Sequence, residues 1–175
     1  AEAFVETLTA QQQADRTPWL LEQKGELTVG SLRLHARADR IDTTPHGTVV
    51  VDYKTGHIPT KKSVTQGLAP QLTLEGLMLA EGGFDKTASP VANMEYWKVG
   101  QGSEPFSRAL NFKEKELTPA LEATKAGLEA LEETFLTKQT PLHALPEKDA
   151  CRLCDFAGLC RRHEWQHDVK QEAAE

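Results

Sequence analysis

The sequence predicts an α/β domain in which a β-hairpin is followed by a helix, a further strand and a long helix. Residues 32–39 alternate apolar and polar side chains, which is typical of a half-buried strand. Residues 48–51, a threonine and three valines, favour a strand that is buried on both faces. Turn residues at Pro45-His46-Gly47 separate the two strands, so we expect them to pair antiparallel.

The later elements follow from similar patterns. A helix is expected from about Pro70, because proline suits a first helical turn, and Gly82-Gly83 should end it. Residues 91–99 are expected to form a strand, with Trp97 as a packing residue. Residues 112–137 predict a long helix, whose apolar stripe we interpret as core: Leu117, Leu121, Leu128, Leu131 and Phe135.

Composition is that of an ordinary globular domain. The chain has 175 residues, of which 39% are hydrophobic and 26% charged, enough for one domain with a real core. The mean hydropathy of −0.48 and the lack of an 18-residue apolar run argue against a membrane span. The net charge of −6 is a mild argument against unaided DNA binding, which favours basic surfaces.

The hairpin concentrates side chains suited to metal chemistry. Asp52 and Lys54 are two residues apart on one strand and therefore leave the same face, which Asp39 can reach if the register allows. Two carboxylates about 4 Å apart repel by roughly 4 kcal/mol at an effective dielectric near 20, and a divalent cation reverses that repulsion. Such a cation activates water and neutralises phosphate charge, and a lysine can orient the water. The set indicates metal-dependent phosphodiester hydrolysis, and the alternative is a solvated hairpin with ordinary surface charges.

The two strand segments, Asp39-Arg40-Ile41-Asp42 and Asp52-Tyr53-Lys54-Thr55-Gly56, resemble the core of the PD-(D/E)XK nucleases, and in particular the RecB-like branch. Residues 70–75 resemble the helix motif that follows in that branch, and the resemblance runs from about residue 20 to 163. It implies a restriction-endonuclease-like central mixed β-sheet flanked by helices, with a C-terminal cysteine-containing helical segment. We expect a nuclease-like domain at residues 1–145 and a metal-binding segment at 146–175 packed on it.

The resemblance also implies roles for individual residues. Asp39 and Asp52 would bind the metal, either Mg²⁺ or Mn²⁺, together with the backbone carbonyl of Tyr53. Lys54 would be the catalytic lysine, and Gln71 would support the site.

Some positions depart from that pattern. Asp42 is three residues from Asp39 and should point to the other face, so we interpret it as structural, paired with Arg40 or a helix end. Glu75 stands where the branch often has tyrosine, so no role carries over to it. A metal-binding His or Glu on an upstream helix is missing. Since residues 1–13 read as the tail of a helix, we expect the chain to be a C-terminal fragment of a longer protein.

The three cysteines, Cys151, Cys154 and Cys160, form the second chemical signal. The Cys-x-x-Cys spacing suits two thiolates that converge on one soft metal. The three resemble the C-terminal cysteines of the AddB-type subunit, in which a distant upstream cysteine completes a 4Fe–4S cluster. The alternatives are a zinc site completed by His163 or His167, and plain reduced thiols.

A basic strip follows the second strand and comprises Lys54, His57, Lys61 and Lys62. It favours phosphate contact beside the site and a solvated basic loop about equally.

We therefore expect a Mg²⁺-dependent DNA exonuclease module in the bacterial cytoplasm. Its partner would be an AddA-type subunit of a helicase–nuclease that acts in double-strand break repair and recombination. The first alternative is a catalytically silent module of the same fold that binds DNA or holds a partner subunit. The second is a zinc-stabilised interaction domain. Retention of Asp39, Asp52 and Lys54 together favours the enzyme.

Overall fold

The computed structural model describes residues 2–13, 15–100, 106–112, 114–141, 151 and 154–160. The chain divides into two compact units, Ala1–Thr137 and Lys138–Glu175. The division expected after residue 145 stays a prediction. Among the described residues, none of the helices has both the length and the apolar character needed to span a bilayer.

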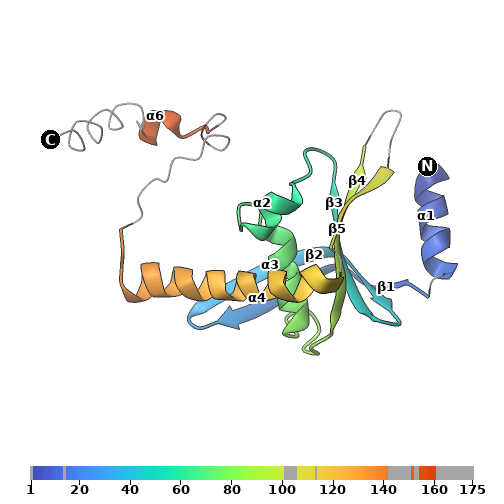
Figure 1. Cartoon of the computed structure of the whole chain (residues 1–175), viewed down its shortest axis with the longest axis horizontal. Coiled ribbons are helices and arrows are strands. Elements are labelled where there is room, and N and C mark those ends of the chain that lie inside the picture. Colours follow the sequence, from blue (N-terminus) through green and yellow to red (C-terminus); the bar gives the residue numbers. More distant parts are fainter. Residues whose placement is uncertain are drawn as a thin grey trace. The chain divides into compact units, whose positions relative to one another are not determined.

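The first unit is built on one mixed sheet in the order β1-β2-β3-β4-β5 (Figure 1). The strands are β1 (Thr17–Val29), β2 (Leu32–Thr44), β3 (Gly47–Lys54), β4 (Val91–Val99) and β5 (Phe106–Asn111). Neighbouring strands are antiparallel except β3 and β4, which are parallel. A parallel pair needs a long crossover, and the chain supplies it through α2 (Lys61–Thr65) and α3 (Gln71–Ala80). The predicted α/β architecture, a mixed sheet flanked by helices, is confirmed.

The predicted β-hairpin is present as β2 and β3, and its register is fixed by the pairs Arg40–Val51 and Asp42–Val49. The turn occupies Pro45 and His46. Gly47 has a φ of +128°, and a Cβ there would lie 2.3 Å from the Pro90 carbonyl oxygen, so only glycine fits. The valines of β3 are buried, as a strand covered on both faces requires.

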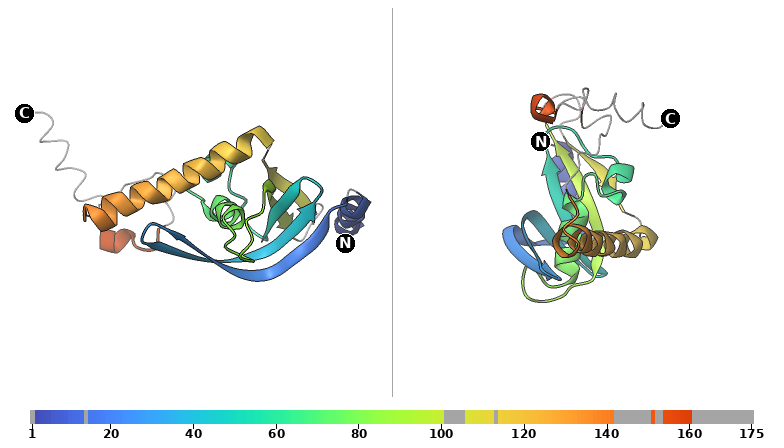
Figure 2. Two further views of the ribbon diagram at one scale, coloured as in Figure 1. Left: turned by 90° about the horizontal axis from the view of Figure 1, so that it is seen from below. Right: turned by 90° about the vertical axis from the view of Figure 1, so that its left-hand side faces the viewer.

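Helices cover both faces of the sheet. In Figure 2, α3 lies between the long helix α4 (Glu114–Leu131) and the β1–β2 ribbon. On this face the core includes Ile41, Val50, Met94 and Tyr96. Helix α1 (Glu2–Gln13) contributes Phe4 to the other face, where its ring meets Trp97 edge-on at 6.3 Å.

The long C-terminal helix matches the prediction in extent but not in every side chain. It continues from α4 into a wider π-helical turn, η1 (Glu132–Thr137). Leu117 and Leu128 are buried, whereas Leu131 is 52% exposed, so its assignment to the core was wrong. The reason is that Leu131 lines an open hollow beside Leu74 and Thr65, beyond the packed part of the stripe.

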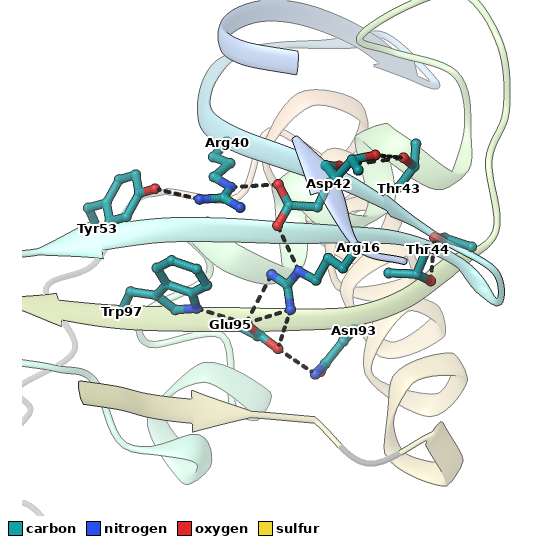
Figure 3. Close-up of polar contacts among 11 residues, drawn as sticks. Arg16, Arg40, Asp42, Thr43, Thr44, Tyr53, Asn93, Glu95 and Trp97 are labelled. Atoms are coloured by element: carbon teal, nitrogen blue, oxygen red, sulfur yellow. Dashed lines mark hydrogen bonds and ion pairs between the residues drawn. The ribbon is translucent and has the colours of Figure 1, made fainter. Parts of the chain in front are cut away.

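The face that carries α1 contains a buried ion network (Figure 3). Arg16 lies 2.7 Å from Asp42 and 3.1 Å from Glu95, and Arg40 Nε donates to Asp42 at 2.5 Å. Both guanidinium groups lie over Trp97, whose Nε1 donates to Glu95 at 2.7 Å. Burial lowers the pKa of Arg40, but the hydrogen bonds and charges of Asp42 and Tyr53 together outweigh burial, so the net pKa is raised. The expected pairing of Asp42 with Arg40 is confirmed.

We expect Asp42→Ala to destabilise the protein by about 3 to 5 kcal/mol, because it leaves two buried guanidinium groups without a shared carboxylate. The measurement is urea unfolding. The matched control is Glu22→Ala, which breaks an exposed ion pair with Arg37 on the same sheet and should cost at most about 1 kcal/mol. Equal losses in the two variants would contradict a central role for the network.

Candidate active site

The hairpin register brings the two predicted metal-binding carboxylates together. Asp39 on β2 accepts a hydrogen bond from the backbone N–H of Tyr53 on β3 at 2.9 Å. This contact places Asp39 beside Asp52, and its charge acts on that carboxyl. The condition that the sequence left open, the register of the two strands, is therefore met.

Lys54 and Gln71 complete a connected cluster with Asp52. Lys54 Nζ lies 3.0 Å from Asp52 Oδ1, 2.8 Å from Asp52 Oδ2 and 2.8 Å from Gln71 Oε1. Gln71 Nε2 donates to Asp52 Oδ1 at 2.6 Å. Gln71 is the first residue of α3, so the start of that helix sets the amide against the end of β3. Side chains from two strands and one helix thus meet at one place.

Glu75 is a further acidic residue at the cluster, for which no role was predicted. It lies one helical turn after Gln71, whose Nε2 donates to Glu75 Oε1 at 3.2 Å. Its side chain is buried, with 3% exposure of the residue. The signal in the sequence was a glutamate at i, i+4 from Gln71 within an otherwise apolar helix.

The cluster is electrostatically strained by excess negative charge. Burial raises the pKa of Asp52, the Lys54 bond opposes that shift, and the charge of Asp39 adds to it. Burial, together with the charges of Asp52 and Asp39, raises the pKa of Glu75 to about 7. Burial, together with the charges of Asp52 and Glu75, raises the pKa of Tyr96 to about 12. One lysine does not balance these acids, and a cation would.

The donor set fits a hard divalent cation. Among the described buried side-chain atoms, Asp52 Oδ2 and Glu75 Oε2 have no hydrogen-bond partner. Lys54 Nζ is close enough to Asp52 Oδ2 to form an ion pair, but its angle does not make a hydrogen bond. Mg²⁺ and Mn²⁺ prefer such carboxylate oxygens. No three acidic, histidine or cysteine side chains of the described part converge as a closed metal cage, so the remaining coordination would come from water or substrate.

The remaining predicted site residues are Tyr53 and the basic strip that follows β3. Tyr53 adjoins Asp52, and the ligand role of its carbonyl stays a prediction. In the basic strip, Lys61 is held 2.8 Å from Glu116 on α4, whereas His57 and Lys62 are exposed. The strip is therefore not a uniform set of unpaired cations.

The predicted metal-binding cysteines lie in the second unit, Lys138–Glu175. Cys151 and Cys160 are half-buried and Cys154 is exposed. The Cys154 N–H lies 3.5 Å from the Cys151 carbonyl, and Cys160 ends the short helix α6 (Ala157–Cys160). His163 and His167, the alternative zinc ligands, lie outside the described residues. The metal role of the three cysteines stays a prediction.

The raised pKa of Glu75 should make the metal-free protein less stable as pH rises. In the unfolded chain Glu75 ionises near 4.5, while in the fold it ionises near 7, so the folded state holds the proton more tightly. Stability should therefore fall between these values by roughly 3 kcal/mol. Glu75→Gln should remove most of this fall, which urea unfolding in EDTA at pH 5 and pH 8 would measure. An unchanged pH dependence in Glu75→Gln would contradict the assignment.

Comparisons with known proteins agree with this geometry. The family model described as the PD-(D/E)XK nuclease superfamily matches residues 1–161. An uncharacterized protein of Rickettsia conorii is 34% identical over 149 residues, which cover 67% of this chain and 17% of that protein. One from Rickettsia bellii is 32% identical over 143 residues, covering 71% and 17%. The chain thus spans about a sixth of these relatives' length. By its matched residues, this restriction-endonuclease-like α/β chain belongs to the PD-(D/E)XK nuclease superfamily.

Proposed function

We propose that this domain is a metal-dependent deoxyribonuclease that hydrolyses phosphodiester bonds. The observation that carries the proposal is the convergence of Asp39, Asp52, Lys54 and Gln71 at the end of β3, where two buried carboxylate oxygens of the cluster have no hydrogen-bond partner. Membership of a nuclease superfamily supports a hydrolase, and the cluster supports Asp52 and Lys54 as the residues at its centre.

Asp39 and Asp52, with the Tyr53 carbonyl, would hold Mg²⁺ or Mn²⁺. The cation, when bound, lowers the pKa of a water and neutralises negative charge on the scissile phosphate. Lys54 forms an ion pair with Asp52 and is partly exposed, so its ammonium can donate a hydrogen bond to the attacking water or to a phosphate oxygen. Gln71 accepts from Lys54 and donates to Asp52, so its amide fixes the position of both.

The wider role we propose is that of an exonuclease module of the RecB-like branch, similar to an AddB-type subunit. It would act on DNA in the bacterial cytoplasm, with an AddA-type helicase–nuclease partner, during double-strand break repair and recombination. The order of the acidic, lysine and glutamine motifs and the C-terminal cysteines supports this placement. The much greater length of the bacterial relatives leaves room for further domains in proteins of this kind.

We expect Asp52→Asn and Lys54→Ala each to reduce cleavage of linear DNA by at least roughly 100-fold, because the first removes a charged metal ligand and the second removes a cation that stabilises the transition state. The assay compares single- and double-stranded DNA with Mg²⁺ or Mn²⁺. The control is Asp85→Asn, a change at an exposed position outside the cluster. Cleavage at the wild-type rate by Lys54→Ala would overturn the mechanism. DNA binding without cleavage by the wild-type protein would favour the silent DNA-binding module.

For the second unit, we propose that Cys151, Cys154 and Cys160 bind a 4Fe–4S cluster completed by a fourth cysteine, or else Zn²⁺ with His163. Cys154→Ala should lower the iron or zinc content of the purified protein and its melting temperature, because bound metal stabilises the segment. Elemental analysis and thermal unfolding measure both. Unchanged metal content together with unchanged melting would show that the thiols are not ligands.

A further inference from the structure

We propose that Glu75 is a third carboxylate ligand of the divalent cation at this site. The inference rests on the proposed function only in requiring a cation beside Asp39 and Asp52. The resemblance to the RecB-like branch assigns no role to a glutamate at position 75.

The first argument is the state of the carboxylate itself. Glu75 is almost completely buried, and its Oε2 has no hydrogen-bond partner. A buried carboxylate oxygen without a partner is costly, and such groups are normally paired or coordinate a metal. Among the other buried side chains of α3, Leu72, Met78 and Leu79 are apolar, and the Thr73 hydroxyl donates to the Pro70 carbonyl. The ionised form of this carboxyl is therefore stabilised by a further positive group, and without one the carboxyl holds a proton more readily.

The second argument is position. Glu75 Oε1 shares the Gln71 amide with Asp52, since Gln71 Nε2 lies 3.2 Å from Glu75 and 2.6 Å from Asp52. Glu75 is close enough to Asp39 and Asp52 for both charges to act on it. Glu75 and Asp52 thus share one amide donor and lie near Asp39, although the three carboxylates do not converge as a closed metal cage in the described part of the chain.

The third argument is charge. With all three carboxylates ionised, Lys54 neutralises one, and a charge of minus two remains, which one divalent cation balances. The ion network on the opposite face has two carboxylates, Asp42 and Glu95, against two guanidinium groups. That network is balanced without a metal, whereas the cluster at Glu75 is not.

A hollow that is open to solvent lies beside Glu75. It has a volume of about 420 Å³ and is lined by Gln71 and Glu75, together with Leu34, Ala36, Leu74 and the basic side chains His35 and Arg37. The Glu75 carboxylate therefore lies next to solvent, although its Oε2 is buried.

The test measures Mn²⁺ binding directly, by the electron paramagnetic resonance signal of free Mn²⁺, in wild type, Glu75→Gln and Glu75→Met. Gln keeps the shape and Met keeps the length, so a folding defect in one still leaves the other as a test. We expect each to weaken Mn²⁺ binding by roughly 10-fold or more, a loss typical of altered metal shells. Glu122→Gln, at an exposed position on α4, is the control and should bind as wild type does.

A purely structural role for Glu75, holding Gln71 in place, makes a different set of predictions. Glu75→Gln would then melt below wild type in EDTA, because the change would disturb Gln71 and through it Asp52. If Glu75 is a ligand, Glu75→Gln melts at or above wild type without metal, because the change removes a buried negative charge. A melting temperature below that of wild type in EDTA would overturn the inference.

Two further outcomes are decisive. If wild type binds Mn²⁺, Asp52→Asn does not, and a folded Glu75 variant binds as tightly as wild type, the inference on Glu75 fails while the proposed metal site stands. If wild type itself binds no Mn²⁺, the metal-dependent function and the role of Glu75 fail together.

Discussion

The register of the β2–β3 hairpin is the constraint on which the site and the core both depend. Successive residues of a strand point to opposite faces, so the pairing of Asp42 with Val49 sends Asp42 towards Arg16 and Arg40. The same pairing keeps Asp39 on the face of Asp52 and α3. A slip of the β2–β3 pairing by one residue would turn Arg40 and Asp42 towards the α3 face. It would also turn Asp39 away from Asp52.

The two faces resolve the cost of buried charge in different ways. On the α1 face, the acidic groups are matched by guanidinium groups that also lie over Trp97, so this half of the sheet is electrostatically complete. On the α3 face, one lysine is shared by several acids. Completed pairing suits a structural role, whereas incomplete pairing leaves oxygens that can bind a cation. The incomplete face is the one that the hollow beside Gln71 opens to.

Close packing fixes α3 over the sheet. A Cβ on Gly76 would lie 2.4 Å from Met94 Sδ, so glycine at this position lets the helix pack against Met94 of β4 without displacing its side chain. Because Gln71 and Glu75 lie on the same short helix, this contact also sets their distance from β3. Local patterns predicted the hairpin, the start of α3 near Pro70 and the bounds of β4, because turn residues, valine runs and apolar spacing act over a few residues.

Sequence reasoning failed where contacts are distant along the chain. Arg16 and Glu95 meet across 79 positions, and nothing local to either indicates the other. The burial of Glu75 likewise depends on the packing of α3 against the sheet, which the sequence of that helix alone does not reveal. The exposure of Leu131 depends on where the packed surface ends, which helical periodicity does not reveal. Periodicity identifies the apolar stripe, and the tertiary structure decides how much of it is covered.

Repulsion among the acids at the site links stability to ligand binding. A cation that binds the folded domain and not the unfolded chain adds stability in proportion to RT ln(1 + [L]/Kd). The same carboxylates that weaken the metal-free fold at neutral pH provide the attraction for the ion. Lys54 moderates this balance, because its ammonium offsets part of the negative charge without occupying every oxygen. A second lysine beside Asp52 would stabilise the metal-free domain. It would also weaken the binding of the cation that the proposed chemistry requires.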